Sequence, residues 1–320
     1  MRAERLPVSR PARRRIPVPG ATAMIAAGLG AGLAGWWLAA RRRPARREPG
    51  THRAARRLNE ASALLGLSVM ADSGLEHFRG EYHNRAMFAA PSVSGIQIGA
   101  SALGAVSDPA RWSTPHHAVQ VASAATGVSG LAFHLWNVLR RPGGLSWQNL
   151  FYGAPVGAPF ALTLAGTVGA AAEHVRGADP HHTRLLGRPA GPALAAGAAF
   201  GLGGTVAEAW LLHLRGAFHN PLMWLPVTVP PVTAALLARA AFVGRGRMPV
   251  TRRMLEATAA LGFAGSAFHA FGVARNMGGW RNWSQNIQSG PPLPAPPSFT
   301  GMALAGLAAL EMMEARNARD

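Results

Sequence analysis

Nine stretches of mostly apolar residues, separated by short polar segments, make up most of this 320-residue sequence. A helix of about 20 residues spans the roughly 30 Å of hydrocarbon in a bilayer, so each stretch is long enough, or nearly so, to cross a membrane. Only 14% of the residues are charged, compared with about 25% in a typical soluble domain. The stretches cover residues 20–40, 58–78, 91–107, 117–139, 155–174, 191–214, 222–243, 254–274 and 298–315. We therefore predict an all-α, polytopic protein of about nine transmembrane helices in contact with the lipid bilayer.

One motif occurs twice in the sequence, with a shift of 136 residues. It reads H-x-R-G-x-[YF]-H-N-x-x-M-[FW] and begins at His77 and again at His213. An acidic residue, Asp72 or Glu208, precedes each copy by five positions. A second similarity lies at a shift of 135, where the Phe-His pair ending at His134 matches the pair ending at His269. Four apolar stretches separate the copies, and an even number of crossings returns the chain to the same side, so the halves are expected to be parallel repeats.

This repeat predicts how the chain is divided. Residues 58–188 and 189–320 should form two tandem four-helix repeats. Residues 1–57 should form a basic arm, in which residues 20–40 make one further membrane helix. A cleaved signal peptide is the alternative interpretation of that helix, but the arginine run directly after it and the lack of a small-residue cleavage site favour a retained anchor.

All of the basic residues are arginines, and the net charge is +18. A strongly basic chain can bind nucleic acid. Here the arginines flank the apolar stretches without interleaved aromatic residues, as in loops that set membrane topology, and we expect no nucleic-acid partner. The side that includes residues 41–57 has more arginines, which predicts a multi-pass inner-membrane protein with both motifs at the periplasmic face. The arginines of the N-terminal tail oppose this orientation, because one spanning anchor would place that tail outside.

The sequence also excludes several kinds of site. Because cysteine is absent, the chain has no disulfide, cysteine-ligated zinc, iron–sulfur cluster or covalently attached c-type haem. It lacks P-loop, HExxH and G-x-S-x-G motifs, which disfavours a hydrolase or a nucleotide-driven enzyme.

Four histidines are expected at matched depth, near the outer ends of the first and third helices of each half. They are His77 with His134, and His213 with His269. Two neutral imidazoles on neighbouring helices can ligate haem iron axially. This pattern predicts one haem b in each bundle, as in a redox subunit that exchanges electrons with a periplasmic or membrane-bound dehydrogenase and with quinone. The motif arginines would bind the haem carboxylates, and these are Arg79 and Arg215.

A non-haem metal ion held by imidazole and carboxylate is an alternative. Its ligands in the first half would be His77, His83, His134 and Asp72. The corresponding ligands in the second half would be His213, His219, His269 and Glu208.

Two further interpretations remain open. The repeated His, Arg and Asn side chains could line a polar pocket of a transporter for a small anion or for protons. They could instead be structural, as in a membrane scaffold or assembly protein, because His and Arg at helix ends often cap carbonyls or extend to the interface. The duplication of the whole histidine set, in helices that otherwise differ, argues against simple anchoring.

Overall fold

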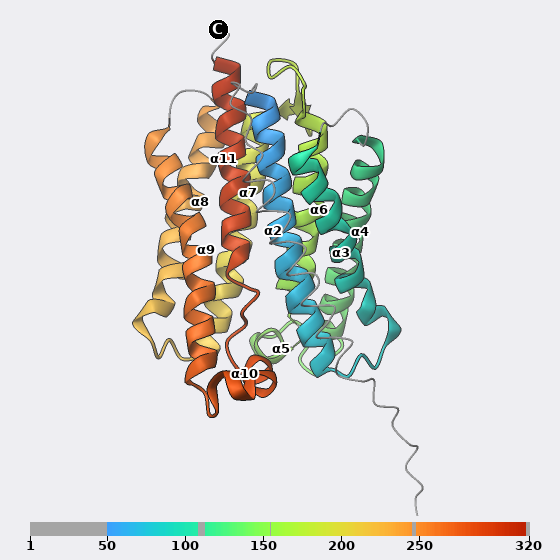
Figure 1. Cartoon of the computed structure of the whole chain (residues 1–320), viewed down its shortest axis with the longest axis vertical. Coiled ribbons are helices and arrows are strands. Elements are labelled where there is room, and N and C mark those ends of the chain that lie inside the picture. The colour runs from blue at the N-terminus through green and yellow to red at the C-terminus, as the bar shows by residue number, and fades with distance from the viewer. Residues whose placement is uncertain (1–49, 108–112, 154, 245–247, 318–320) are drawn as a thin grey trace, which may run out of the picture.

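The computed structural model describes residues 50–107, 113–153, 155–244 and 248–317, and Figure 1 shows its arrangement. The helix expected at residues 20–40 and most of the basic arm lie outside these residues. The described chain is almost wholly helical. Its strands are β1 (Arg184–Leu185) and β2 (Arg188–Pro189), which pair antiparallel.

Eight long helices account for the eight apolar stretches after residue 57. They are α2 (Gly50–Arg79), α3 (Ala89–Val106), α4 (Ser113–Leu139), α6 (Gly157–Val175), α7 (Ala190–Arg215), α8 (Leu225–Val243), α9 (Pro249–Arg275) and α11 (Pro297–Asn317). Short helices occupy the loops: η1 (Arg85–Phe88), α5 (Trp147–Tyr152), η3 (Pro221–Trp224), η4 (Gly279–Asn282) and α10 (Trp283–Ser289). The loops that contain α5 and α10 lie at the same end of the molecule, opposite the end of α11 (Figure 1).

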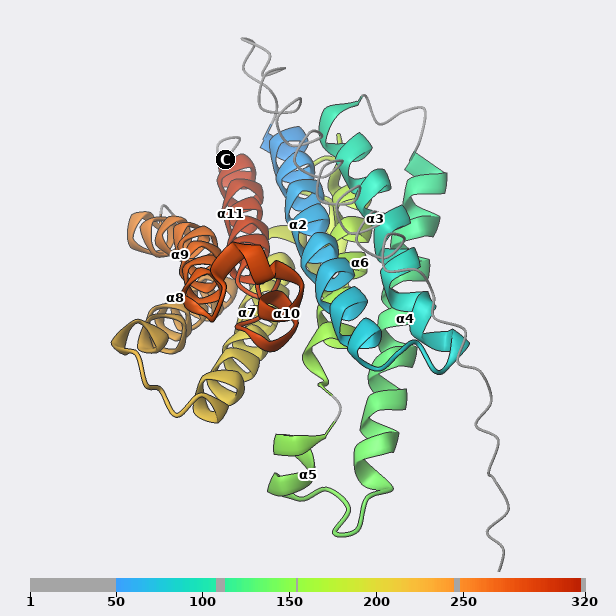
Figure 2. The same ribbon diagram turned by 60° about the horizontal axis from the view of Figure 1, so that its bottom comes forward.

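The long helices form two sets, which lie side by side in Figure 2. In the first set, α2 packs against α3, α3 against α4, α4 against α6 and α6 against α2. In the second set, α7, α8, α9 and α11 contact one another in the same cyclic order. The two sets join mainly through α2 and α11, whereas α6 and α7 contact each other only lightly.

Five of the helical segments are long and apolar enough to cross a membrane. They are Arg85–Val106, Thr114–Leu139, Ala190–Arg215, Pro221–Val243 and Pro249–Arg275. Only 17% to 39% of each apolar window is buried inside the protein, so most of its residues are at least partly exposed. Ile96 and Phe242, for example, are 63% and 87% exposed. So much exposed apolar surface would be unfavourable in water, and the prediction of an integral membrane protein made of helices is confirmed.

The central helices α2 and α11 are more polar than these five. The two backbones approach closely where Gly301 on α11 meets α2, because a Cβ at Gly301 would overlap the side chain of Leu65 and lie 3.1 Å from the carbonyl oxygen of Ala61. Nearer the end where α11 finishes, Arg57 on α2 forms a salt bridge of 2.9 Å with Glu311 on α11. The other long helices surround α2 and α11, so these two helices can carry charged residues without exposing them to lipid.

Glycines set the packing of the third helix of each set against the fourth. A Cβ at Gly127 on α4 would overlap the backbone nitrogen of Thr163 on α6. A Cβ at Gly262 on α9 would overlap the side chain of Thr300 on α11. Backbone cannot move aside as a flexible side chain can, so these positions require glycine.

A buried polar cluster holds the first set together. Gln97 on α3 donates to the Oε1 of Gln120 on α4 at 3.3 Å, and Gln120 donates to Ser101 at 2.8 Å. All three side chains are fully buried. At the positions shifted by 136 and 135 residues from Ser101 and Gln120, the second set has Leu237 and Leu255. The two sets therefore share an arrangement of helices but differ in the chemistry of their interiors.

The glycine contact gives a test of this packing. Replacing Gly127 with Leu should lower the free energy of unfolding by about 1–3 kcal/mol or more, because the new side chain has no space between α4 and α6. Gly203 on α7 is the matched control, since no atom lies within 4 Å of a Cβ built there. Thermal unfolding in detergent should show a clear loss for Gly127→Leu and none for Gly203→Leu. Equal stability of the two variants would contradict the close approach of α4 and α6.

Candidate functional site

Each copy of the motif forms the turn that follows a long helix. After α2 the backbone passes through Glu81 and Tyr82, whose φ angles are 57° and 45°. After α7 it passes through Ala217 and Phe218, whose φ angles are 54° and 46°. Non-glycine residues seldom adopt positive φ, so two successive ones make an unusual turn. The two copies of the motif therefore have the same local backbone geometry.

The first histidine of each motif closes this turn. The Nδ1 of His77 lies 2.5 Å from the carbonyl oxygen of Met87, and the Nδ1 of His213 lies 2.8 Å from that of Met223. A carbonyl oxygen carries no proton, so Nδ1 must be the protonated nitrogen and the donor. The Nε2 of each ring is then a hydrogen-bond acceptor.

The second histidine of each motif bonds within the turn itself. His83 and His219 each donate from Nδ1 to the carbonyl of a glycine three residues earlier, at 2.9 Å in both cases. Both side chains are exposed. The third histidine, His134 on α4 or His269 on α9, donates Nδ1 to the carbonyl of a proline in the following loop, at 2.5 and 2.7 Å. All six repeated histidines therefore fix the backbone at the end of a bundle.

The motif asparagines also have backbone partners. The Oδ1 of Asn84 accepts from the backbone N–H of Ala86 at 2.9 Å and caps η1. The Oδ1 of Asn220 accepts from the N–H of Leu222 at the same distance and caps η3. Much of the repeated pattern is thus explained by loop geometry.

The structure brings together the histidines of the first and third helices. The ring centroids of His213 and His269 are 6.5 Å apart, with an angle of 71° between the planes. His77 and His134 lie within electrostatic range of each other. In the described part of the chain, however, no group of three or more His, Asp or Glu side chains is placed to hold a metal ion.

The motif arginines point to protein groups. Arg79 forms an ion pair with Glu76, one turn earlier on α2. Arg215 donates to the backbone carbonyl of Leu150 at 3.3 Å, and its guanidinium carbon lies 5.3 Å from the ring centroid of Phe151. The expected contact of these arginines with haem carboxylates stays a prediction that this geometry does not favour.

A cavity of about 920 Å³ lies where the two sets contact each other lightly. Its walls come from α6, α7, α9, the start of α11 and the outer half of α2. Most of the lining is apolar or aromatic. The aromatic residues are Phe160, Phe268, Phe271 and Phe299. A largely apolar cavity with a few polar groups is the usual form of a small-molecule site.

Two carboxylates reach this cavity from matching positions, Asp72 on α2 and Glu208 on α7. The two groups interact electrostatically with each other. Neither forms a hydrogen bond or an ion pair with another side chain among the described residues. The Glu208 carboxylate lies against Gly157, the first residue of α6, and a Cβ at that position would overlap it.

Other polar groups lie on the same wall. His213, His219 and His269 line the cavity, and each has its Nδ1 bonded to a carbonyl. Arg275 also lines it, with its guanidinium carbon 5.8 Å from the ring centroid of Phe271. Apart from this arginine, the charged and imidazole groups of the lining present acceptors rather than donors.

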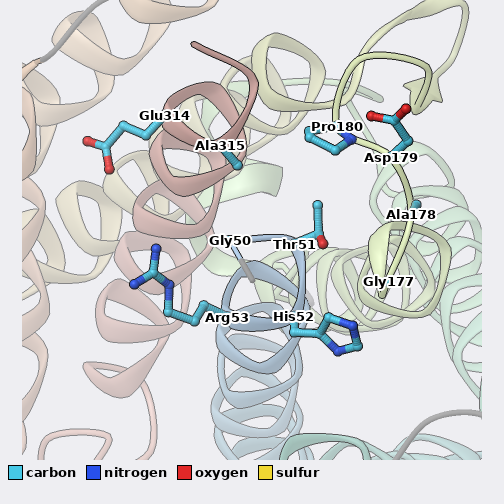
Figure 3. Close-up of a pocket in the computed structure, with 10 residues that line it drawn as sticks. All are labelled: Gly50, Thr51, His52, Arg53, Gly177, Ala178, Asp179, Pro180, Glu314 and Ala315. Carbon is cyan, nitrogen blue, oxygen red and sulfur yellow. The ribbon is translucent and has the colours of Figure 1, made fainter. Parts of the chain in front are cut away.

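A second cavity, of about 620 Å³, lies at the opposite end of the molecule (Figure 3). The start of α2 contributes His52 and Arg53, and the loop after α6 contributes Asp179. The backbone N–H of His181 and the imidazole of His182 donate to Asp179 and lower the pKa of its carboxyl below the ordinary value. None of the motif residues lines this cavity.

The sequence interpretation did not predict the cavity between the halves. It paired each acid with the histidines of its own half, whereas the structure places Asp72 and Glu208 on the same cavity. A signal for this arrangement was present. In two parallel repeats side by side, a residue that faces the axis between them also faces its own counterpart, and the two acids occupy matching positions.

Comparisons with known proteins give no further guide. No protein-family model matches the chain, and no curated protein or solved structure is significantly similar to it. The function is therefore argued from the residues of the site.

The histidine–carbonyl bonds can be tested by a pair of substitutions. His77→Ala should lower the free energy of unfolding by about 1–3 kcal/mol, because it removes the half-buried donor that joins the end of α2 to η1. His83→Ala should lower it by about 0.5 kcal/mol, because that bond is exposed. Denaturant unfolding in detergent measures both values. If the two variants lost stability equally, the proposed structural role of His77 would be wrong.

Proposed function

We propose that this integral membrane protein binds a small, lipid-soluble molecule bearing hydrogen-bond donors, in the cavity between its two four-helix halves. The observation that carries the proposal is the cavity of about 920 Å³, which is mostly apolar and contains Glu208, His213 and His269. The protein would then belong to the membrane proteins that bind or transport small ligands. An apolar ligand would reach it from the surrounding lipid.

The character of the polar groups selects the ligand. Both cavity histidines of α7 and α9 donate Nδ1 to the protein itself, so they offer only Nε2, an acceptor. An ionised carboxylate also only accepts. A ligand without donors would displace the water that bonds to these acceptors and would leave them unpaired. An unpaired polar group in an apolar site costs free energy of binding. A molecule with hydroxyl or ammonium donors, such as a quinol with an apolar tail, fits this lining.

The membrane arrangement is part of the same proposal. Two tandem parallel repeats in a bacterial-type inner membrane, with the motif turns at the periplasmic face, agree with the arginine distribution and with the shared turn geometry. About nine crossings follow if α2, α6, α11 and residues 20–40 also span the bilayer. The acceptor-rich end of the cavity then lies near the outer surface.

Filling the cavity should abolish binding. Ala161→Phe on α6 adds a ring to the cavity lining and should weaken binding of a decyl-tailed hydroquinone by about tenfold or more. Quenching of tryptophan fluorescence in detergent would follow the titration. Ala125→Phe is the matched control, because Ala125 is exposed on α4 and does not line the cavity. Equal affinities of the two variants, or no saturable binding to the unaltered protein, would reject the cavity as the site.

One observation favours a second candidate, a haem b held by His213 and His269. Their ring centroids lie 6.5 Å apart, a separation that two metal–nitrogen bonds of about 2 Å each and the two ring radii would span. Their Nδ1 atoms are bonded to carbonyls, which orients Nε2 as the ligating nitrogen. Haem would supply one-electron chemistry, and the partners would be quinone and a periplasmic or membrane-bound dehydrogenase.

Titration with haem distinguishes this candidate. Addition of haem b to the purified protein should produce a Soret band and a reduced-minus-oxidised α-band, with saturation at a fixed stoichiometry. His269→Ala should abolish these bands, because it removes one axial ligand. The exposed His83 serves as the control, since His83→Ala should leave the spectrum unchanged. A titration without saturable spectral change in the unaltered protein would exclude haem at this pair.

A further inference from the structure

Asp72 and Glu208 place two acidic groups in a largely apolar cavity within the membrane-spanning part of the protein. Both side chains are partly buried, and no described side chain forms a hydrogen bond or an ion pair with either of them. A carboxylate at membrane depth is unfavourable unless a proton or a cation neutralises it. No described arginine forms an ion pair with either acid, so a cation bound between them would supply charge that the chain leaves at a distance.

The nearby arginines act on these acids only at a distance, because their direct contacts are with other groups. The chain contains no lysine, so arginine is its only permanently charged cation. Arg79 and Arg215 each lie seven residues beyond the acid on the same helix, or about 10 Å along its axis. Arg79 is paired with Glu76, and Arg215 contacts a carbonyl and an aromatic ring of the α5 segment.

Arg275 is the one permanently cationic residue among the lining residues that the structure describes. It lies at the last residue of α9, six positions after His269, and stacks near Phe271. It therefore lies toward the outer end of the cavity. The lining holds two acids and one arginine, so its charge is negative when both acids are ionised.

The Glu208 carboxylate lies against Gly157, in the space that a Cβ at this position would occupy. Phe160 lines the same wall one turn further along α6, and Phe268 and Phe299 line the wall formed by α9 and α11. Aromatic faces attract cations, and the attraction is stronger where water is excluded.

We infer that the ligand of this cavity is an organic cation with an apolar body, such as a protonated amine, held by Asp72 and Glu208. The inference rests on the proposed function and specifies the donor-bearing ligand by its charge. The apolar walls would contact the body of the ligand, and the two acids would neutralise its charge.

A lipophilic cation of fixed charge tests this inference directly. Radiolabelled tetraphenylphosphonium, which has no titratable group, would be dialysed against the purified full chain in detergent. The unaltered protein should bind it saturably, and Glu208→Gln and Asp72→Asn should each weaken binding by about tenfold or more. Glu256→Gln, which removes an exposed acid on α9 outside the cavity, should leave binding unchanged.

The neutral analogue triphenylphosphine oxide completes the experiment. It should bind far more weakly than the cation, and its binding should not depend on Glu208. If both probes bind equally, or if Glu208→Gln leaves binding of the cation unchanged, the inference is overturned. If only the hydroquinone bound, and Ala161→Phe blocked its binding, the inference of a cationic ligand would be overturned and the proposed function would stand. No saturable binding of any probe to a protein that unfolds cooperatively would overturn both.

Discussion

The contact between α2 and α11 is the constraint on which the rest of the structure depends. Gly301 lets the backbone of α11 approach Ala61 of α2 closely, and the salt bridge between Arg57 and Glu311 neutralises charge within that contact. The outer helices then present mostly apolar surface to lipid. A central pair of this kind separates two roles, because the inner helices can carry polar chemistry while the outer ones provide solubility in the bilayer.

The same contact explains why a cavity exists. If the two halves were related by an ideal two-fold axis, α6 would pack against α7 as closely as α11 packs against α2. The structure departs from this, since α6 and α7 contact each other only lightly and the cavity lies between them. Asp72 reaches it from the closely packed side and Glu208 from the open side. Because the two contacts between the halves differ, the two matching acids line one cavity and not two separate ones.

The sequence predicted the helices well because long apolar stretches leave few alternatives to membrane helices, and α3, α4, α8 and α9 follow the expected stretches closely. It also predicted the depth of the histidines, since depth follows from counting residues along a helix, and His213 does lie beside His269. It could not predict which nitrogen of each ring faces a carbonyl. That depends on the turn after each helix, including the positive φ values at Ala217 and Phe218, which no periodicity shows. The count of crossings and the repeat remain predictions.

The polar interior of the first half has a mechanical consequence. Ser62, Gln97, Ser101 and Gln120 form a hydrogen-bonded cluster that joins α2, α3 and α4. Moving one of these helices past another would break several such bonds where no water can replace them. At the matching level of the second half, Leu237 and Leu255 can exchange one apolar neighbour for another with little loss. At this level the helices of the first half are therefore harder to slide past one another than α8 and α9, whose buried Thr233–Thr258 hydrogen bond lies about one turn away.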